Sequence, residues 1–172
     1  MTRLKRTERF ERAKDLQYYP LALNIKGKLV VVAGGGKVSL MKVRALLKAF
    51  AKVRVVSPDL ISELKKLNKN SKIEWVSRNI RSSDLKDAFV VIAATSDEKV
   101  NRSVSDWANS RKILINVVDQ PSLSNFISPA VFRKKEAIVS VFTNGISPSL
   151  SRDIKSFLNE KWQEFLSSRN CW

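Results

Sequence analysis

The chain contains no histidine and a single cysteine, Cys171. The lack of histidine excludes a Ser-His-Asp triad and the zinc sites that use imidazole. A group that moves a proton during a reaction must therefore be a carboxylate, a lysine, a tyrosine or Cys171. One cysteine forms no disulfide within the chain, which favours a reducing compartment, and we expect the protein in the cytoplasm.

Long apolar runs are also missing from the sequence. No run approaches the roughly 20 apolar residues that a membrane-spanning helix needs, so we expect no membrane association. Residues 1–17 carry six basic and three acidic side chains and lack the apolar stretch of a secretory signal. We expect this segment to be a basic N-terminal arm without a core of its own.

Acidic residues are half as numerous as basic ones: 16 against 32, for a net charge of +16. This charge fits a lysine-rich solvated surface, a nucleic-acid partner or a small polyanion. The basic residues are spread along the chain, and no basic motif is interleaved with aromatic residues as in RNA-recognition domains. We therefore favour a solvated surface together with a polycarboxylate substrate, and we do not expect a nucleic-acid partner.

Apolar runs of strand length alternate with helical patterns over most of the chain. Strands are expected at 28–33, 53–56, 73–76, 89–93 and 113–118. Helices are expected after Gly36, from Ser57-Pro58 to about Leu67, with Ser57 as the N-cap, and over 97–109. This alternation predicts an α/β fold with a Rossmann-like parallel sheet of about five strands.

The pattern changes after Asp119. Residues 137–142 are typical of a strand, and Arg133-Lys134-Lys135 is a plausible hairpin tip before it. Asn144-Gly145 turns the chain, and Ser147-Pro148 begins a single last helix with an apolar stripe. We therefore expect a small α+β segment followed by a C-terminal helix.

Three consecutive glycines, Gly34, Gly35 and Gly36, end the first strand. A strand, a glycine turn and a helix form the element that holds the pyrophosphate of a dinucleotide. Lys37 and Val38 open the helix, and Ser39 stands where the fingerprint expects its last small residue. We interpret the turn as a cofactor site; the alternative is a glycine-rich turn without a ligand.

The carboxyl ends of the other expected strands carry polar residues. Because these ends line the ligand crevice of a parallel sheet, we add five residues to the cofactor site: Ser57, Thr95, Asp97, Asn116 and Val118. Ser57 offers neither the carboxylate that holds the ribose of NAD nor a basic clamp for NADP, although Asp59, Arg54 and Arg78 are near in sequence. The choice between NAD and NADP therefore stays open.

The chain resembles the precorrin-2 dehydrogenases, which form the sirohydrochlorin-producing part of sirohaem synthases. The resemblance covers roughly residues 18–155, in order and at the family's spacing. The matching residues are Tyr19-Pro20-Leu21, Gly34-Gly35-Gly36 with Val38 and Lys42, Ala93-Ala94-Thr95 with Asp97 and Asn101, Asn116-Val117-Val118-Asp119 with Pro121, Phe126, Pro129-Ala130, and Gly145-Ile146-Ser147-Pro148 with Leu150 and Arg152. The chain departs from the family at Met41, where an arginine is frequent, and at Asn144, where a glycine is frequent.

The resemblance implies an NAD-dependent oxidation of precorrin-2 to sirohydrochlorin, with iron insertion in some members. It also implies an interlocked homodimer, with a Rossmann domain at 18–118, a dimerisation and substrate segment at 119–146 and a C-terminal helix at 147–172. Asp119 matches the catalytic aspartate, and would also handle the metal in a chelatase. Asn101, Ser147 and Pro148 match residues near the substrate.

Each of these residues also has a purely structural interpretation. Asp119 could only initiate a turn, Asp97 and Ser147 could only cap the helices that follow them, and Asn101 could be an ordinary helix residue. Two other functions remain: a catalytically inactive module that senses NAD or a tetrapyrrole, and a nucleic-acid binder, which rests on charge alone. We favour the dehydrogenase because several motifs match together.

Overall fold

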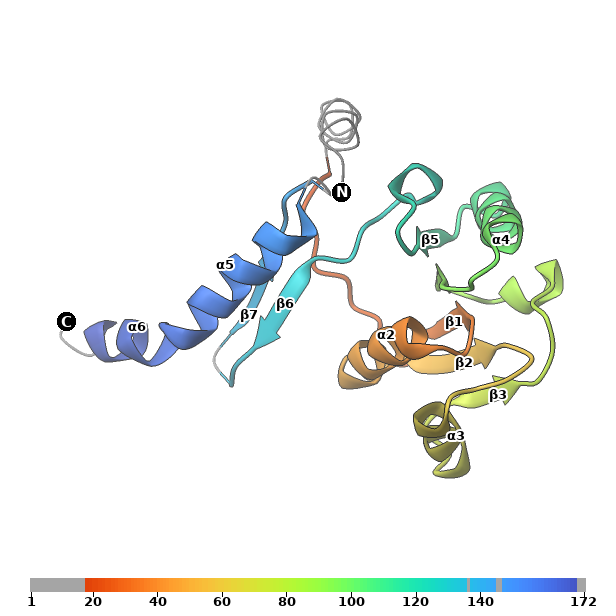
Figure 1. Cartoon of the computed structure of the whole chain (residues 1–172), viewed down its shortest axis with the longest axis horizontal. Coiled ribbons are helices and arrows are strands. Elements are labelled where there is room, and N and C mark those ends of the chain that lie inside the picture. Colours follow the sequence, from red (N-terminus) through yellow and green to blue (C-terminus); the bar gives the residue numbers. More distant parts are fainter. Residues whose placement is uncertain (1–17, 136, 145–146, 170–172) are drawn as a thin grey trace. The chain divides into compact units, whose positions relative to one another are not determined.

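The computed structural model describes residues 18–135, 137–144 and 147–169. The chain divides into two compact units, each described by itself below (Figure 1). One unit is Leu21–Phe126, and the other contains residues 18–20 and 127–169. The N-terminal arm expected at 1–17, the turn glycine Gly145 and Cys171 lie outside the described residues.

The larger unit is built on a parallel sheet of five strands in the order β3-β2-β1-β4-β5. The strands are β1 (Leu29–Ala33), β2 (Lys52–Val56), β3 (Glu74–Val76), β4 (Val90–Ala93) and β5 (Leu114–Val117). The central strands are rich in valine because a sheet that is covered on both faces needs apolar residues at consecutive positions. The predicted α/β fold with a Rossmann-like sheet is therefore confirmed.

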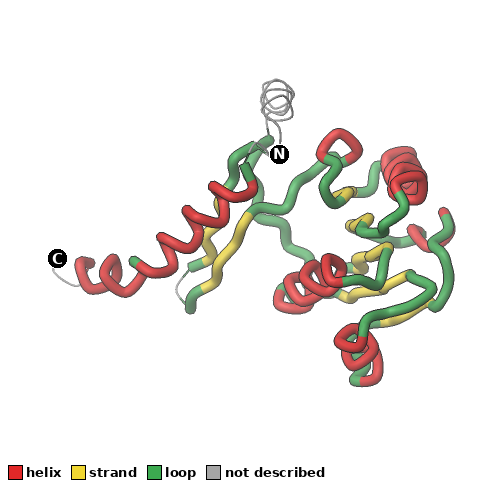
Figure 2. The backbone as a smooth tube through the Cα atoms, viewed as in Figure 1, coloured by secondary structure: helices red, strands yellow, loops and turns green. Residues whose placement is uncertain are grey.

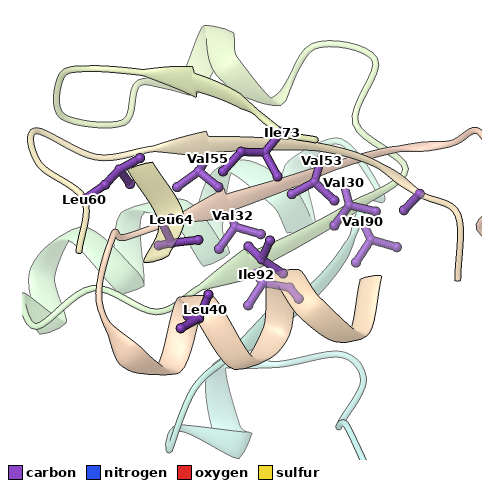
Figure 3. Packing of buried hydrophobic residues seen from close by; sticks show 12 residues of the cluster. Val30, Val32, Leu40, Val53, Val55, Leu60, Leu64, Ile73, Val90 and Ile92 are labelled. Atoms are coloured by element: carbon purple, nitrogen blue, oxygen red, sulfur yellow. The ribbon is translucent and has the colours of Figure 1, made fainter. Parts of the chain in front are cut away.

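Helices pack against both faces of this sheet. Figure 2 shows how helices and strands alternate along this part of the chain. Successive residues of β1 point to opposite faces: Val30 and Val32 to one, Val31 and Ala33 to the other. The first face packs against α2 (Lys37–Lys48) and α3 (Ser62–Lys69), from which Leu40 and Leu64 join the cluster in Figure 3. The second face packs against α4 (Glu98–Ser110) and the short 3-10 helix η1 (Ser82–Leu85).

The helix expected from Ser57-Pro58 begins later than predicted, at Ser62, so that prediction was wrong. The backbone of the preceding residues is bonded to other elements instead. The Ser57 N–H donates to the Val76 carbonyl (3.2 Å), and the Ile61 N–H donates to the Gly35 carbonyl (3.0 Å). A segment held to β3 and to the glycine turn cannot also close the i to i+4 bonds of a helix.

The smaller unit contains an antiparallel hairpin, β6 (Ala130–Arg133) and β7 (Ile138–Val141), and two helices. The hairpin tip expected at Arg133-Lys134-Lys135 is confirmed, because the Lys134 N–H donates to the Ala137 carbonyl (2.9 Å). The last helix is not single: α5 (Pro148–Glu160) ends at Lys161, and α6 (Trp162–Arg169) follows. The ring of Trp162 packs edge-on against Phe132, with centroids 5.7 Å apart, which attaches the start of α6 to the hairpin.

Asn144 takes a left-handed backbone conformation, with φ of 50°. Asparagine tolerates this region better than most residues, so it can replace the glycine that is frequent here in the resembling family. None of the helices in the described ranges combines the length and the apolar character needed to cross a membrane.

A charged contact organises the loop between β3 and η1. The guanidinium of Arg78 donates to both carboxylate oxygens of Asp84 (2.7 Å each), and the Arg81 N–H donates to the same carboxylate (2.7 Å). Asp84 is buried, with 7% of its surface exposed. The hydrogen bonds from Arg78 hold the pKa of Asp84 below its ordinary value.

We expect Asp84→Asn to lower the free energy of unfolding by about 1–3 kcal/mol, because a neutral amide cannot accept both guanidinium bonds. Since the pKa of Asp84 is lowered in the folded state, its stabilisation is complete above the ordinary carboxyl pKa and is lost as the pH falls through the lowered one. Urea unfolding of the two proteins should give free energies that differ at neutral pH and converge in acid. A constant difference across this range would contradict the role of the charge.

Candidate functional site

The glycine turn joins β1 to α2, and the first two glycines are required by close packing. Gly34 has φ of +112°, and a Cβ there would press on the carbonyl of Ala94 after β4. A Cβ on Gly35 would overlap the carbonyl of Asp59 and come within 2.9 Å of Ser57 Oγ. Only glycine lets these three backbone segments meet.

Gly36 differs from its two neighbours. Its backbone is extended, with φ of −93°, and a Cβ there would meet no atom within 4 Å. Neither conformation nor packing in this structure therefore requires a glycine at this position. The open space in front of Gly36 lies directly at the N-terminus of α2.

The first turn of α2 suits an anion. Gly36 is the N-cap residue, no side chain caps the helix, and the turn contains no acidic residue. The free N–H groups and the positive end of the helix dipole are the elements that bind a pyrophosphate. Ser39 is fully buried, and a Cβ on Gly34 would lie 3.2 Å from its hydroxyl oxygen. The site therefore fits a dinucleotide: it has open space in front of Gly36 and a helix end without a capping side chain or an acidic residue.

The loop after β4 is held by Asn101, a buried residue of α4. Asn101 Oδ1 accepts hydrogen bonds from the Thr95 N–H (3.2 Å) and the Thr95 hydroxyl (2.7 Å), and Asn101 Nδ2 donates to the Thr95 carbonyl (3.0 Å). Asp97 caps α4 by accepting from the Lys99 and Val100 N–H groups. The contacts of both side chains are thus internal to this loop and helix.

At the end of β2, Ser57 is buried beside the glycine turn. The basic residues near it have acidic neighbours. Arg78 is bonded to Asp84, and Arg54 Nε lies 2.9 Å from Glu74 Oε2 in an ion pair without a hydrogen bond. Asp59 pairs with Lys65 at 2.8 Å. Both arginines that the sequence offered as a clamp for NADP, Arg54 and Arg78, therefore have an acidic neighbour.

The end of β5 brings together Asn116, Asp119 and a residue to which sequence reasoning gave no role, Lys42 of α2. Lys42 Nζ donates to Asn116 Oδ1 (3.2 Å), and Asn116 Nδ2 donates to the Phe126 carbonyl (3.2 Å). Burial lowers the pKa of Lys42, and the nearby negative charge of Asp119 partly offsets that effect. The sequence marked Lys42 only as one of the residues that match the resembling family, and it gave no sign of the contact with Asn116.

Asp119 is exposed and has a left-handed backbone, with φ of 61°. It follows Val118, whose N–H donates to the Ala93 carbonyl (2.9 Å) and so extends β5 along β4. Its carboxylate is therefore carried on the same edge of the sheet as the glycine turn, since parallel strands end together. No group of three or more Asp, Glu, His or Cys side chains that could hold a metal forms within 18–135, 137–144 and 147–169.

The larger unit thus gathers most of the predicted site residues at the carboxyl edge of its sheet: Gly34, Gly35, Gly36, Lys37, Val38, Ser57, Thr95, Asp97, Asn101, Asn116, Val118 and Asp119. Ser147 and Pro148 belong to the other unit. There Ser147 caps α5, accepting from the Leu150 N–H (3.2 Å), and Pro148 occupies the first turn.

Residues 21–130 match the protein family described as "Putative NAD(P)-binding". The chain belongs to this family. The family match covers the sheet, the glycine turn and the end of β5, which are the parts whose geometry suits a dinucleotide.

Curated proteins similar to this chain include siroheme synthases. The chain is 42% identical over 141 residues to one from Thioalkalivibrio sulfidiphilus, which covers 82% of this chain and 29% of the relative. It is 36% identical over 154 residues to one from Buchnera aphidicola, which covers 90% of this chain and 32% of the relative. The chain therefore spans about three-tenths of the length of these relatives.

A solved structure, "SirC, precorrin-2 dehydrogenase", resembles this NAD(P)-binding chain with a TM-score of 0.73. The two share 28% sequence identity, and the alignment covers 84% of this chain and 71% of SirC. The larger unit, Leu21–Phe126, makes up less of the chain than the 84% that the alignment covers. The similarity therefore extends beyond the unit that contains the parallel sheet.

The family assignment makes Gly36 the sharpest test of the cofactor site. We expect Gly36→Asp to fold normally, because the side chain enters open space, and to weaken NAD binding at least about tenfold through steric and charge conflict with the pyrophosphate. Titration calorimetry measures the affinity, and thermal unfolding checks the fold.

Two further variants act as controls for this test. Ala45→Asp adds the same charge to an exposed position of α2 and should leave NAD affinity within about twofold. Gly34→Ala should instead destabilise the fold, because its Cβ presses on the Ala94 carbonyl. Unchanged NAD affinity in Gly36→Asp would mean that the turn has no role in cofactor binding.

Proposed function

We propose that the protein catalyses the NAD-dependent dehydrogenation of precorrin-2 to sirohydrochlorin. The observation that carries the proposal is the pairing, on one edge of one sheet, of an open dinucleotide cradle at Gly36 with the carboxylate of Asp119. The similarity to SirC and to siroheme synthases supports the choice of substrate.

The proposed reaction removes two hydrogens from the tetrapyrrole, one as a hydride and one as a proton. When bound, NAD⁺ supplies the hydride acceptor. The protein has to hold the cofactor at Gly34–Gly36, Lys37 and Val38, place the substrate beside it and accept the proton. In this proposal Asp119 accepts the proton, because it is an exposed carboxylate at the end of β5.

The remaining site residues take their proposed roles from their places on the sheet edge. Ser57 directly follows β2, where the ribose binds in dinucleotide folds. Toward the nicotinamide half, Thr95 and Asp97 follow β4, Asn116 lies in the last part of β5, and Val118 directly follows it. We favour NAD over NADP, because Arg54 and Arg78 both have acidic neighbours.

Two of the proposed substrate residues have clear structural contacts. The side chain of Asn101 makes three hydrogen bonds to Thr95, so we propose that it acts on the site by positioning that residue. Ser147 and Pro148 begin α5, and the N–H groups of a helix start suit a substrate carboxylate. The net charge of +16 also suits a polycarboxylate. A role of Asp119 in metal insertion stays a prediction. We also propose that the protein is located in the cytoplasm.

We expect Asp119→Asn to lower kcat by about 10²–10⁴, because an amide cannot accept the proton. Asparagine tolerates the left-handed backbone at this position, so the fold and NAD affinity should not change. The measurement is anaerobic NADH formation from precorrin-2 and NAD, followed by absorbance. The matched control is Asp106→Asn, which removes a carboxylate from an exposed position of α4.

The outcomes of this assay separate the dehydrogenase from a catalytically inactive module that senses NAD or a tetrapyrrole. Turnover by the wild type that is lost in Asp119→Asn supports the dehydrogenase. Turnover that persists in Asp119→Asn would contradict the role of Asp119. NAD binding without any turnover in the wild type would overturn the proposed reaction in favour of a sensor.

We also propose that the protein is a homodimer that assembles through its smaller unit. Large apolar side chains are exposed on the hairpin and on both helices of this unit: Ile138 (58%), Leu150 (49%), Phe157 (59%) and Phe165 (49%). Phe157 and Phe165 also line an open depression between α5 and α6. Exposed apolar surface of this kind is typical of an interface between protein chains.

Phe157→Asp is expected to shift the protein from dimer to monomer, because burying an unpaired carboxylate in an interface is unfavourable. Sedimentation velocity at several protein concentrations measures this shift. The control is Phe50→Asp, which changes an equally large and 72% exposed phenylalanine on the larger unit. A wild type that sediments as a monomer at all concentrations would refute the dimer.

A further inference from the structure

The turn that carries Asp119 is held in an uncommon conformation. Asp119 lies in the left-handed region with φ of 61°, between the end of β5 at Val117 and the 3-10 helix η2 (Pro121–Leu123). For a residue other than glycine this conformation is unfavourable, and it persists only where the surrounding structure fixes it. The left-handed backbone of Asp119 must therefore be held by contacts of the neighbouring residues.

The hydroxyl of Ser124 bonds to the chain on both sides of Asp119. Ser124 Oγ accepts from the Val117 N–H (2.8 Å), and it lies within donating distance of the Gln120 carbonyl (3.1 Å) and the Val117 carbonyl (3.3 Å). A hydroxyl has one proton and two lone pairs, so it can accept from Val117 and donate to Gln120 at once. One side chain thus closes the loop across the residues that flank Asp119.

Neighbouring contacts hold Ser124 itself against the sheet. Asn125 Oδ1 accepts from the Ile115 N–H (2.8 Å), and the Asn125 N–H donates to the Ile115 carbonyl (3.0 Å). The hydroxyl of Ser105 on α4 donates to the Leu123 carbonyl (2.5 Å). The segment after η2 is therefore held by hydrogen bonds to both β5 and α4. These bonds keep Ser124 in place beside the turn that contains Asp119.

We propose that Ser124 is a positioning residue for Asp119: its hydroxyl bridges Val117 and Gln120 and so presents the Asp119 carboxylate at the carboxyl end of β5. This inference rests on the proposed function, in which Asp119 accepts a proton. A misplacement of about 1 Å at a reacting group can slow a reaction about 10²-fold, so a device that holds this turn has a direct effect on rate.

The simpler interpretation is that Ser124 and Asn125 only cover the edge of the sheet. β5 is the edge strand, and the side chains of both residues accept from its outward N–H groups. The two interpretations differ in their consequences. Covering the edge affects stability alone, whereas positioning Asp119 also affects kcat without affecting the affinity for NAD.

Ser124→Ala separates these interpretations. We expect the amide hydrogen of Val117 to exchange about tenfold faster in this variant, and kcat to fall about tenfold or more, while the KM for NAD stays within about twofold. Hydrogen exchange followed by NMR and the anaerobic NADH assay measure these quantities on the whole chain.

Ser124→Thr and Ser122→Ala are the matched controls. Ser124 has an extended backbone, with φ of −109° and ψ of 140°, which suits threonine, so the retained hydroxyl should restore exchange and kcat to within about twofold of the wild type. Ser122 is exposed in the same loop, and Ser122→Ala should change neither quantity.

Each result decides the proposal. Unchanged exchange at Val117 in Ser124→Ala would overturn the bridge, whatever the activity. Faster exchange with unchanged kcat in an active protein would mean that Ser124 covers the edge and does not position Asp119. A wild type without turnover would overturn the proposed function, and the exchange rates would still test the bridge by themselves.

Discussion

The structure of the larger unit depends on one close backbone contact, at Gly34 and Gly35. The carbonyls of Ala94 and Asp59 occupy the space that side chains at these positions would need. Through this contact the end of β1 meets the loop after β4 and the segment after β2. The Ile61 N–H adds a hydrogen bond to the Gly35 carbonyl (3.0 Å). Larger residues at Gly34 or Gly35 would separate these segments, and the edge on which the site lies would lose its shape.

The third glycine, Gly36, takes no part in this close backbone contact. Because Gly34 and Gly35 satisfy the packing, Gly36 and the first turn of α2 face open space without a capping side chain. A turn that served the fold alone would gain stability from a serine or an aspartate as N-cap. The absence of such a cap is understandable if an anionic group approaches this helix end, as the NAD(P)-binding family assignment implies.

Sequence periodicity was sufficient to predict the sheet, because strands buried on both faces have unmistakable apolar runs. It also located the glycine turn and the residues at the strand ends. It was wrong at Ser57-Pro58, which has the residue types of a helix start but bonds to Val76 and Trp75 instead. It also missed the break at Lys161, which the apolar stripe crosses without a change. The roles of Lys42 and Ser124 could not be predicted, because both depend on contacts with residues that only the fold brings near.

Lys42 shows how the cofactor end of the site is connected to the reacting end. It lies on α2, whose N-terminus would receive the pyrophosphate, and it bonds Asn116 on β5, three residues before Asp119. Its half-buried ammonium donates to the neutral amide of Asn116, and the charge of Asp119 acts on it from nearby. Ser124 fixes the backbone on either side of the same carboxylate. The position of Asp119 is thus fixed by its backbone, whereas its electrostatic environment comes from α2. A single helix therefore links the proposed cofactor cradle to the carboxylate that would accept the proton.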